Sequence, residues 1–175
     1  MAIYQYYLAF IPQVGLVIKH GEIPTEINVT TEDGYFNANT EQYWELAEIN
    51  FDKVKLEIDR LIDKADWWND EECLNWKTYT SEVDNDASMS LNSETKKIEH
   101  LSFRADLREP QLKFLNGMLE LAKRKEMLLI DRKGKILTPE YNDIKNYIKN
   151  SNSFKFIENP EKFLDDLSNG KITIE

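Results

Sequence analysis

The sequence predicts an α+β protein in which an antiparallel sheet carries helices packed on one face. Three observations lead to this class: an apolar strand comes first, three strands with two-residue periodicity fill the middle, and amphipathic helices separate and follow them. The order strand, helix, three strands, helix, hairpin, two helices is related to the split β-α-β (ferredoxin-like) arrangement. An extra strand and a helical C-terminal tail are added to it.

The first element is a strand over residues 3–11, which is apolar on both alternating faces and ends at Pro12. Residues 12–38 follow with a weaker pattern and are expected to form an insertion. A short extended piece is expected at Leu16–Ile18, and a turn at Asp33-Gly34.

The next element is a helix that begins after Asn39 and runs to about Ala65, with a break near Asn50. Its apolar residues fall on one stripe: Ala47, Phe51, Val54, Ile58, Leu61 and Ile62. After it comes Asp66–Glu72, an acidic loop that carries two tryptophans.

The middle of the chain changes to a period of two. Residues 75–83, 87–91 and 97–108 are predicted to be strands of an antiparallel meander, with turns at 84–86 and 92–94. One face of the last strand is apolar and the other is polar, so one face of the sheet is expected to be open.

The second half continues with a helix opened by Pro110. A strand at 127–131 turns into 135–137 as a hairpin, and helices with N-terminal proline signals make residues 138–175 a helical tail. No internal repeat or linker divides the chain, so residues 1–175 are predicted to form a single domain.

The charge balance restricts the partners. The chain carries 32 acidic against 22 basic residues, a net charge of −10, which repels nucleic acid and anionic membranes and attracts a basic protein. The N-terminus has no basic leader and no apolar run is long enough to span a bilayer, so we expect a cytoplasmic protein. The single Cys73 fits a reducing compartment.

The residues that commonly carry chemistry are scarce. His20, Cys73 and His100 do not fall at metal-ligand spacings, so no metal or other cofactor is expected. A Cys73/His100 nucleophile pair is disfavoured because Glu71 and Glu72 beside the cysteine oppose a thiolate. Neither a serine nucleophile elbow nor a glycine-rich phosphate loop occurs, and the sequence favours a binding protein over an enzyme.

Asp84-Asn85-Asp86 begins like a calcium loop. Met89 stands where that loop needs glycine and Thr95 where it needs a bidentate glutamate, so a hairpin turn is the better interpretation. The abundant carboxylates elsewhere point to no particular acid-base pair.

The best candidate site combines exposed acids with aromatic anchors. Trp67 and Trp68 are adjacent, so both are not expected to point inward, and tryptophan often dominates interface energies. The alternative is a helix-end cap in which one ring closes the core. The predicted partner-binding residues are Trp67, Trp68, Asp70, Glu71, Glu72, Asp84 and Asp86.

A second candidate is the row Arg104, Asp106 and Arg108, which alternation places on the polar face of one strand. Such a row suits a small anion held by guanidinium groups, in a ligand-binding or enzymatic domain. It equally suits an ion network that stabilises the sheet. Both interpretations stay open at this point.

Short motifs in the second half of the chain resemble small acidic bacterial immunity proteins of polymorphic-toxin loci. The resemblance covers residues 75–167 and rests on these segments: Phe103–Arg108, Phe114-Leu115, Leu129–Asp131, Lys133-Gly134, Pro139, Phe156, Asn159-Pro160 and Phe163-Leu164. It implies a cytoplasmic, non-catalytic inhibitor that binds a basic toxin, often a nuclease, through acidic surface. It transfers no individual contact residue. A third interpretation is a housekeeping domain kept soluble by its charge.

Overall fold

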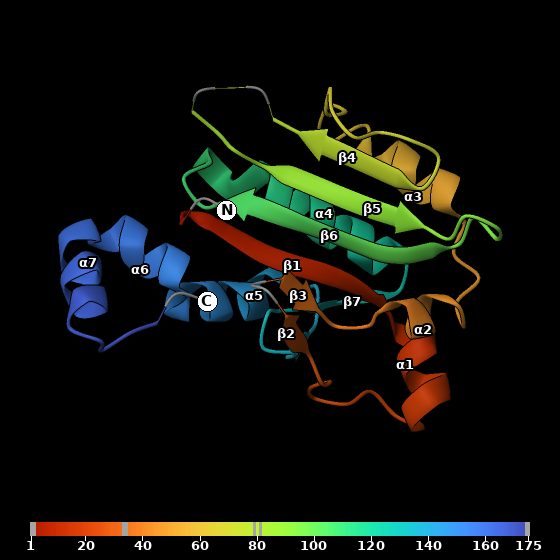
Figure 1. Cartoon of the computed structure of the whole chain (residues 1–175), viewed down its shortest axis with the longest axis horizontal. Helices are drawn as coiled ribbons and strands as arrows, with labels where there is room; N and C mark the ends of the chain where they lie inside the picture. The colour runs from red at the N-terminus through yellow and green to blue at the C-terminus, as the bar shows by residue number, and fades with distance from the viewer. Residues whose placement is uncertain (1–2, 33–34, 79, 81, 174–175) are drawn as a thin grey trace.

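The computed structural model describes residues 3–32, 35–78, 80 and 82–173. A six-stranded antiparallel sheet with the order β4-β5-β6-β1-β7-β8 forms its centre (Figure 1). The strands are β1 (Gln5–Pro12), β4 (Cys73–Lys77), β5 (Asp86–Leu91), β6 (Ile98–Asp106), β7 (Met127–Ile130) and β8 (Ile136–Leu137). β1 lies inside the sheet, which agrees with its apolar character on both faces.

The four inner strands have the predicted split β-α-β arrangement. The helix α4 (Lys113–Arg124) connects β6 to β7, and β1 lies between these two strands and pairs antiparallel with both. β4 is the extra strand at one edge, and β8 is the second strand of the predicted hairpin at the other. The predicted α+β class is therefore confirmed.

One face of the sheet carries the main hydrophobic core. The helices α3 (Phe51–Ile58), α4 and α5 (Tyr141–Asn150) contribute to it, with the short 3₁₀ turn Pro110–Leu112 leading into α4. Figure 1 shows α3 and α4 behind the strands. Residues buried in this core include Leu8, Phe10, Trp44, Val54, Trp76, Phe103, Leu115, Met118 and Ile144.

The opposite face is only partly covered. The helices α1 (Gln13–His20) and α2 (Glu41–Trp44) and the small ribbon of β2 (Thr30–Glu32) and β3 (Tyr35–Asn37) lie toward β1 and β7. Ile11 packs there against Leu16 and Tyr43. α2 also contacts β6, whereas in Figure 1 no helix or strand of the described residues lies over this face of β4 and β5.

Two predicted elements before the meander differ in the structure. The extended piece at 16–18 is wrong, because this segment belongs to α1, which buries Leu16 and ends at Gly21 with φ of 79°. The helix predicted to reach Ala65 is two short helices, α2 and α3. Its predicted break is confirmed, since the Asn50 side chain caps α3 by accepting from the Lys53 N–H at 3.0 Å.

The strands of the meander are also shifted. β4 begins at Cys73 and ends at Lys77, whereas the prediction ran from 75 to 83, of which residues 79 and 81 lie outside the described residues. β6 ends at Asp106, two residues before the predicted end. The turn predicted at Asp33-Gly34 also lies outside the described residues.

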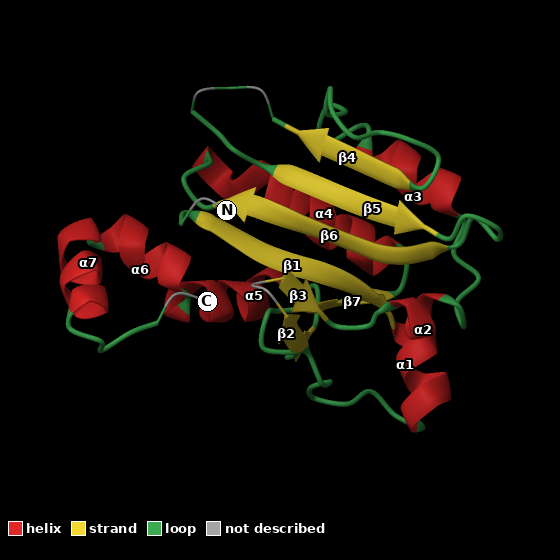
Figure 2. Cartoon of the chain, in the orientation of Figure 1, coloured by secondary structure: helices red, strands yellow, loops and turns green. Residues whose placement is uncertain are grey.

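The C-terminal part is helical, as predicted, and contains one more helix than expected. α6 (Asn152–Glu158) lies between α5 and α7 (Pro160–Ser168), and Figure 2 shows α6 and α7 beyond the end of the sheet. The Ser151 side chain caps α6 by accepting from the Phe154 N–H at 3.2 Å. Within the described ranges, no helix has the length and apolar character that crossing a membrane requires.

Candidate functional site

The acidic loop between α3 and β4 closes the outer edge of β4. We call residues 63–72 the edge loop. Its backbone makes three hydrogen bonds to the outer side of the strand: Lys77 N to Asp63 O at 2.9 Å, Ala65 N to Asn75 O at 2.9 Å, and Asp70 N to Cys73 O at 3.0 Å. The loop therefore acts as an irregular seventh row of the sheet and is held by it.

The far edge of the sheet is closed in a similar way. The backbone of residues 25–27 lies along β8 and its turn, where Ile136 N donates to Thr25 O at 2.9 Å and Ile27 N donates to Gly134 O at 2.8 Å. Both outer strands thus have backbone partners from a loop.

Amide side chains fix the edge loop further. Asn75 donates from its side chain to the Trp68 carbonyl at 2.6 Å, and its N–H donates to the Asn69 side chain at 2.8 Å. Asn69 donates in turn to the Ala65 carbonyl at 2.7 Å. These contacts restrain the loop on both sides of Trp68, so its shape is set before any partner binds.

Asp70 holds the return of the loop into β4. Its Oδ1 accepts from the N–H groups of Glu72 at 2.8 Å and Cys73 at 2.7 Å. These two backbone hydrogen bonds hold the pKa of the Asp70 carboxyl below its usual range. Asp70 is therefore both a loop-forming residue and a fixed negative charge at the surface.

The side chains of the edge loop point outward. Trp68 is 84% exposed and adopts φ of 43°, a left-handed conformation that is unusual for a large residue, and Trp67 is 43% exposed. Asp66, Asp70, Glu71 and Glu72 are exposed around them. Neither tryptophan closes the core, so the helix-end cap considered above does not describe Trp68.

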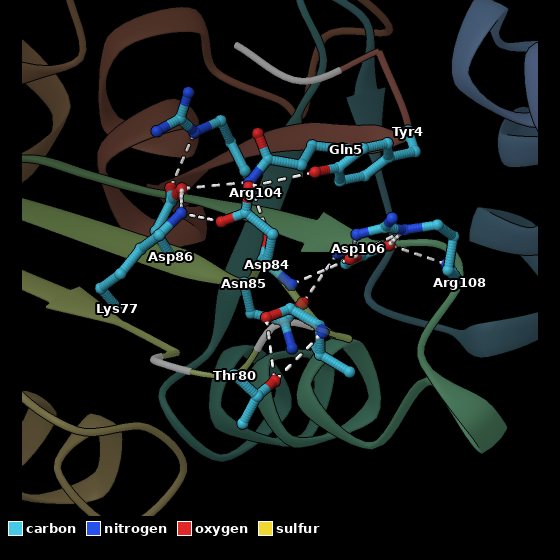
Figure 3. Close-up of polar contacts among 11 residues, drawn as sticks. Tyr4, Gln5, Lys77, Thr80, Asp84, Asn85, Asp86, Arg104, Asp106 and Arg108 are labelled. Carbon is cyan, nitrogen blue, oxygen red and sulfur yellow. Dashed lines mark hydrogen bonds and ion pairs between the residues drawn. The ribbon is translucent and has the colours of Figure 1, made fainter.

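The other two predicted partner-binding acids lie at the opposite end of β4, in an internal cluster (Figure 3). Lys77 forms ion pairs with Asp84 and, at 3.5 Å, with Asp86. Arg104 Nε donates to Asp86 at 2.7 Å, and the Gln5 side chain donates to Asp86 at 3.2 Å. Asp86 is thus almost buried, and the structure does not bring Asp84 and Asp86 together with the edge loop.

Asp106 is the centre of the same cluster. It is fully buried and accepts three hydrogen bonds from the Arg108 guanidinium, the shortest at 2.7 Å, and one each from the backbone N–H groups of Arg108 and Asp84 at 2.9 Å. The Asn85 side chain accepts from the Asp106 N–H at 2.7 Å. Arg108 Cζ lies 3.4 Å from the Tyr4 ring centroid, and hydrogen bonding to Asp106 raises the pKa of Arg108.

The predicted row Arg104, Asp106 and Arg108 is therefore divided. Arg104 pairs with Asp86 on β5, while Arg108 lies beyond the end of β6, not within it as expected. Each guanidinium group faces a carboxylate of this chain. These contacts are those of an ion network that ties residues 84–86 to β1 and β6.

His100 occupies a polar position under α2. Its Nδ1 lies 3.1 Å from Thr40 Oγ1, and since that hydroxyl donates to the Glu99 carbonyl, Nδ1–H is the donor toward Thr40. Nε2 lies 3.4 Å from the Tyr7 hydroxyl. Burial lowers the pKa of His100 and raises that of Tyr7 to about 12.

The structure separates the residues of the disfavoured nucleophile pair. Cys73 pairs with Ser90, which pairs with His100, so two strand spacings, about 10 Å, lie between cysteine and histidine. His20 contacts the Tyr43 hydroxyl at 3.1 Å instead. Among the described residues, no three His, Cys, Asp or Glu side chains are placed to hold a metal ion.

A pocket of about 480 Å³ lies between the start of β1, the β7–β8 turn and the α5–α6 junction, and sequence reasoning did not find it. Its residues come from segments more than a hundred positions apart, so no local motif marks it. Comparison with known proteins adds no assignment: no family model, curated protein or solved structure matches the chain.

Proposed function

We propose that this chain is a non-catalytic protein-binding domain that presents the edge loop to a basic protein partner. The observation that carries the proposal is Trp68, which is 84% exposed at φ of 43° on a loop pinned by side-chain hydrogen bonds. A large apolar ring held out in a strained conformation contributes little to folding, and tryptophan is a frequent anchor in interfaces.

The carboxylates around Trp68 define the chemistry of the partner. Asp66, Asp70, Glu71 and Glu72 are exposed within seven positions of the chain, and the Glu71 side chain is 92% exposed. In a protein of net charge −10 they form a negative rim around an apolar centre. Such a rim accelerates association with a cationic surface, while the Trp68 ring, once buried by the partner, slows dissociation.

The partner class that fits best is a basic toxin, so the proposed role is an immunity-type inhibitor. The resemblance of residues 75–167 to immunity proteins supports this role, as does a negative surface that competes with nucleic acid for a basic nuclease. Asp84 and Asp86 are left out of the proposed surface, because Lys77 and Arg104 already neutralise them.

The test begins with affinity purification from the native cell and identification of a basic protein that co-elutes. Association kinetics are then measured with the purified partner at low salt. Glu71→Lys combined with Glu72→Lys should lower the association rate about tenfold or more, since steering contributes factors of 10 to 1,000. Trp68→Ala should mainly accelerate dissociation, by about thirtyfold for a 2 kcal/mol anchor.

The matched control is Glu22→Lys combined with Glu161→Lys, which makes the same change in net charge at two exposed positions outside the edge loop. It should change the association rate far less than the loop variant. Two outcomes would exclude the edge loop as the binding surface. The first is an equal change of the association rate in both double variants; the second is partner binding whose rates are unchanged by Trp68→Ala and by the loop charge reversal.

A further inference from the structure

The pocket near the start of β1 gathers positive charge in an otherwise acidic protein. Arg132, Lys133 and Lys135 all line it, as do the carboxylates Asp131 and Glu26. Asp131 is already used by the turn, because its Oδ1 accepts from the N–H groups of Lys133 and Lys135 at 2.9 Å each. The balance of the lining is positive, while the whole chain has a net charge of −10.

The turn that carries these cations is rigid. Gly134 has φ of 84°, and a Cβ at this position would lie 2.1 Å from the Ile27 carbonyl oxygen. The chain therefore needs glycine here to dock the turn against residues 25–27. Arg132, Lys133 and Lys135 thus start from a backbone that is fixed without a ligand, which lowers the cost of binding one.

Aromatic rings form the other walls of the pocket. Arg132 Cζ lies 5.1 Å from the centroid of the Tyr7 ring, and Lys135 Nζ lies 5.9 Å from that of Tyr147. Each cation is therefore held beside a ring face.

We propose that this pocket binds a small aromatic acid: a planar ring that carries a phosphate or carboxylate group. Arg132, Lys133 and Lys135 contact the anionic group, and Tyr7 and Tyr147 contact the ring. A volume of about 480 Å³ suits one such molecule, because ligand pockets commonly measure about 300 to 1,000 Å³. This site is separate from the edge loop and does not depend on the proposed function.

Titration calorimetry of the full chain with phenyl phosphate and with benzoate tests the proposal. At least one of them should bind saturably, with a dissociation constant in the millimolar range or below. Inorganic phosphate, which has the anionic group without the ring, and benzyl alcohol, which has the ring without the anionic group, should bind more weakly. If neither aromatic acid binds, or if inorganic phosphate binds as tightly as phenyl phosphate, the proposal is wrong.

The helix α5 supplies an internal control for the location. Tyr141 and Tyr147 are both 37% exposed, and each has a lysine Nζ 5.9 Å from its ring centroid, Lys145 and Lys135 respectively. Of these four residues, Tyr147 and Lys135 line the pocket and Tyr141 and Lys145 do not. The two tyrosines therefore match in chemistry, exposure and helix and differ in position, while the lysines differ in that Lys135 is half-buried in the β7–β8 turn and Lys145 is exposed on α5.

Lys135→Gln and Tyr147→Leu should each weaken binding of the aromatic acid at least fivefold, whereas Lys145→Gln and Tyr141→Leu should leave it within twofold. Thermal unfolding of the four variants shows that they fold, which their partial exposure leads us to expect. If all four variants bind like the original chain, or if both pairs lose binding equally, the ligand does not occupy this pocket.

Discussion

Two acidic segments of this chain have similar compositions and opposite environments. In the edge loop, Asp66–Glu72 leaves its carboxylates at the surface around an exposed tryptophan. At the other end of β4, Asp84 and Asp86 lie against Lys77 and Arg104 and contribute to the interior. The difference arises from the neighbouring strands, which place Lys77 and Arg104 against one segment, whereas the other faces solvent and Glu71 forms an exposed ion pair with Lys96 at 3.5 Å.

The comparison shows that acidic residues next to each other in sequence do not define a binding surface. A carboxylate opposite a lysine or arginine on the next strand stabilises the sheet, and its charge is no longer available to a partner. A carboxylate beyond the sheet edge keeps its charge for recognition. The following variants test this division, beginning with the largest expected effect.

Asp106→Asn should be strongly destabilising. It replaces a fully buried carboxylate that accepts from the Asp84 N–H and from the Arg108 guanidinium, whose side chain is 39% exposed, and losing a hydrogen bond to a charged group costs about 1.5 to 3 kcal/mol. Urea unfolding measures the change. Glu71→Gln, which removes a charge from the edge loop, should stay within about 0.5 kcal/mol of the original chain. Similar losses in both variants would contradict the division into a structural and a surface segment.

Asn75→Ala should lower the free energy of unfolding by about 1 kcal/mol, because it removes the side-chain hydrogen bond to the Trp68 carbonyl. The more specific readout is amide hydrogen exchange, which should accelerate at Glu72 and Cys73. Asn116→Ala removes a side-chain bond to a backbone carbonyl elsewhere and should leave these amides unchanged. Unaltered exchange in Asn75→Ala would show that the edge loop is not held by this contact.

Acidification from pH 7 to pH 5 should affect His100 before it affects the edge loop. Burial lowers the pKa of His100, so below about 6.5 the unfolded chain binds a proton that the folded chain does not. The free energy of unfolding should therefore decrease as the pH is lowered, by at most about 1.4 kcal/mol per pH unit. The Asp70 carboxyl, whose pKa is lowered, stays charged throughout.

Unfolding of His100→Asn measured across this pH range isolates the histidine. The variant should have a flatter pH dependence than the original chain, and the asparagine amide can still donate toward Thr40. An identical slope in both proteins would assign the titration to another group.

Trp68→Gly should cost almost nothing in stability, within about 1 kcal/mol of zero, because relief of the left-handed conformation offsets the flexibility of glycine. Trp76→Ala should cost about 3 to 5 kcal/mol, since this ring is 1% exposed and donates to Asp59. Thermal or urea unfolding compares them. A large loss for Trp68→Gly would make this ring a structural residue and weaken the proposed function.

The sequence predicted the sheet better than its surroundings. Alternation located the central strand, the meander and the hairpin, because the side-chain period reports which face is buried. It misread residues 16–18, where Val17 and Ile18 favour a strand, although Leu16 docks into the core from a helix. It also extended the helix to Ala65, since pattern alone does not show that residues 63–65 bond to β4.

The candidate site was predictable in part. Adjacent tryptophans among acids correctly indicated an exposed ring, but the Asn69 and Asn75 contacts that fix it depend on the path of the loop along β4. The pairing of Asp86 with Arg104 requires the register of β5 and β6, which single-sequence periodicity does not supply. The pocket unites residues from β1 and α5 and was therefore invisible in the sequence.

Because loops occupy the outer backbone groups of β4 and β8, this sheet offers little template for strand addition or fibril growth in the described parts of the chain. Because Asp63, Ala65 and Asp70 supply the backbone bonds to β4, deleting residues 63–70 should uncover this strand and promote self-association. The edge loop, which is the proposed binding surface, therefore also shields the edge of β4 from other chains. A variant that removes this loop is expected both to lose partner binding and to aggregate.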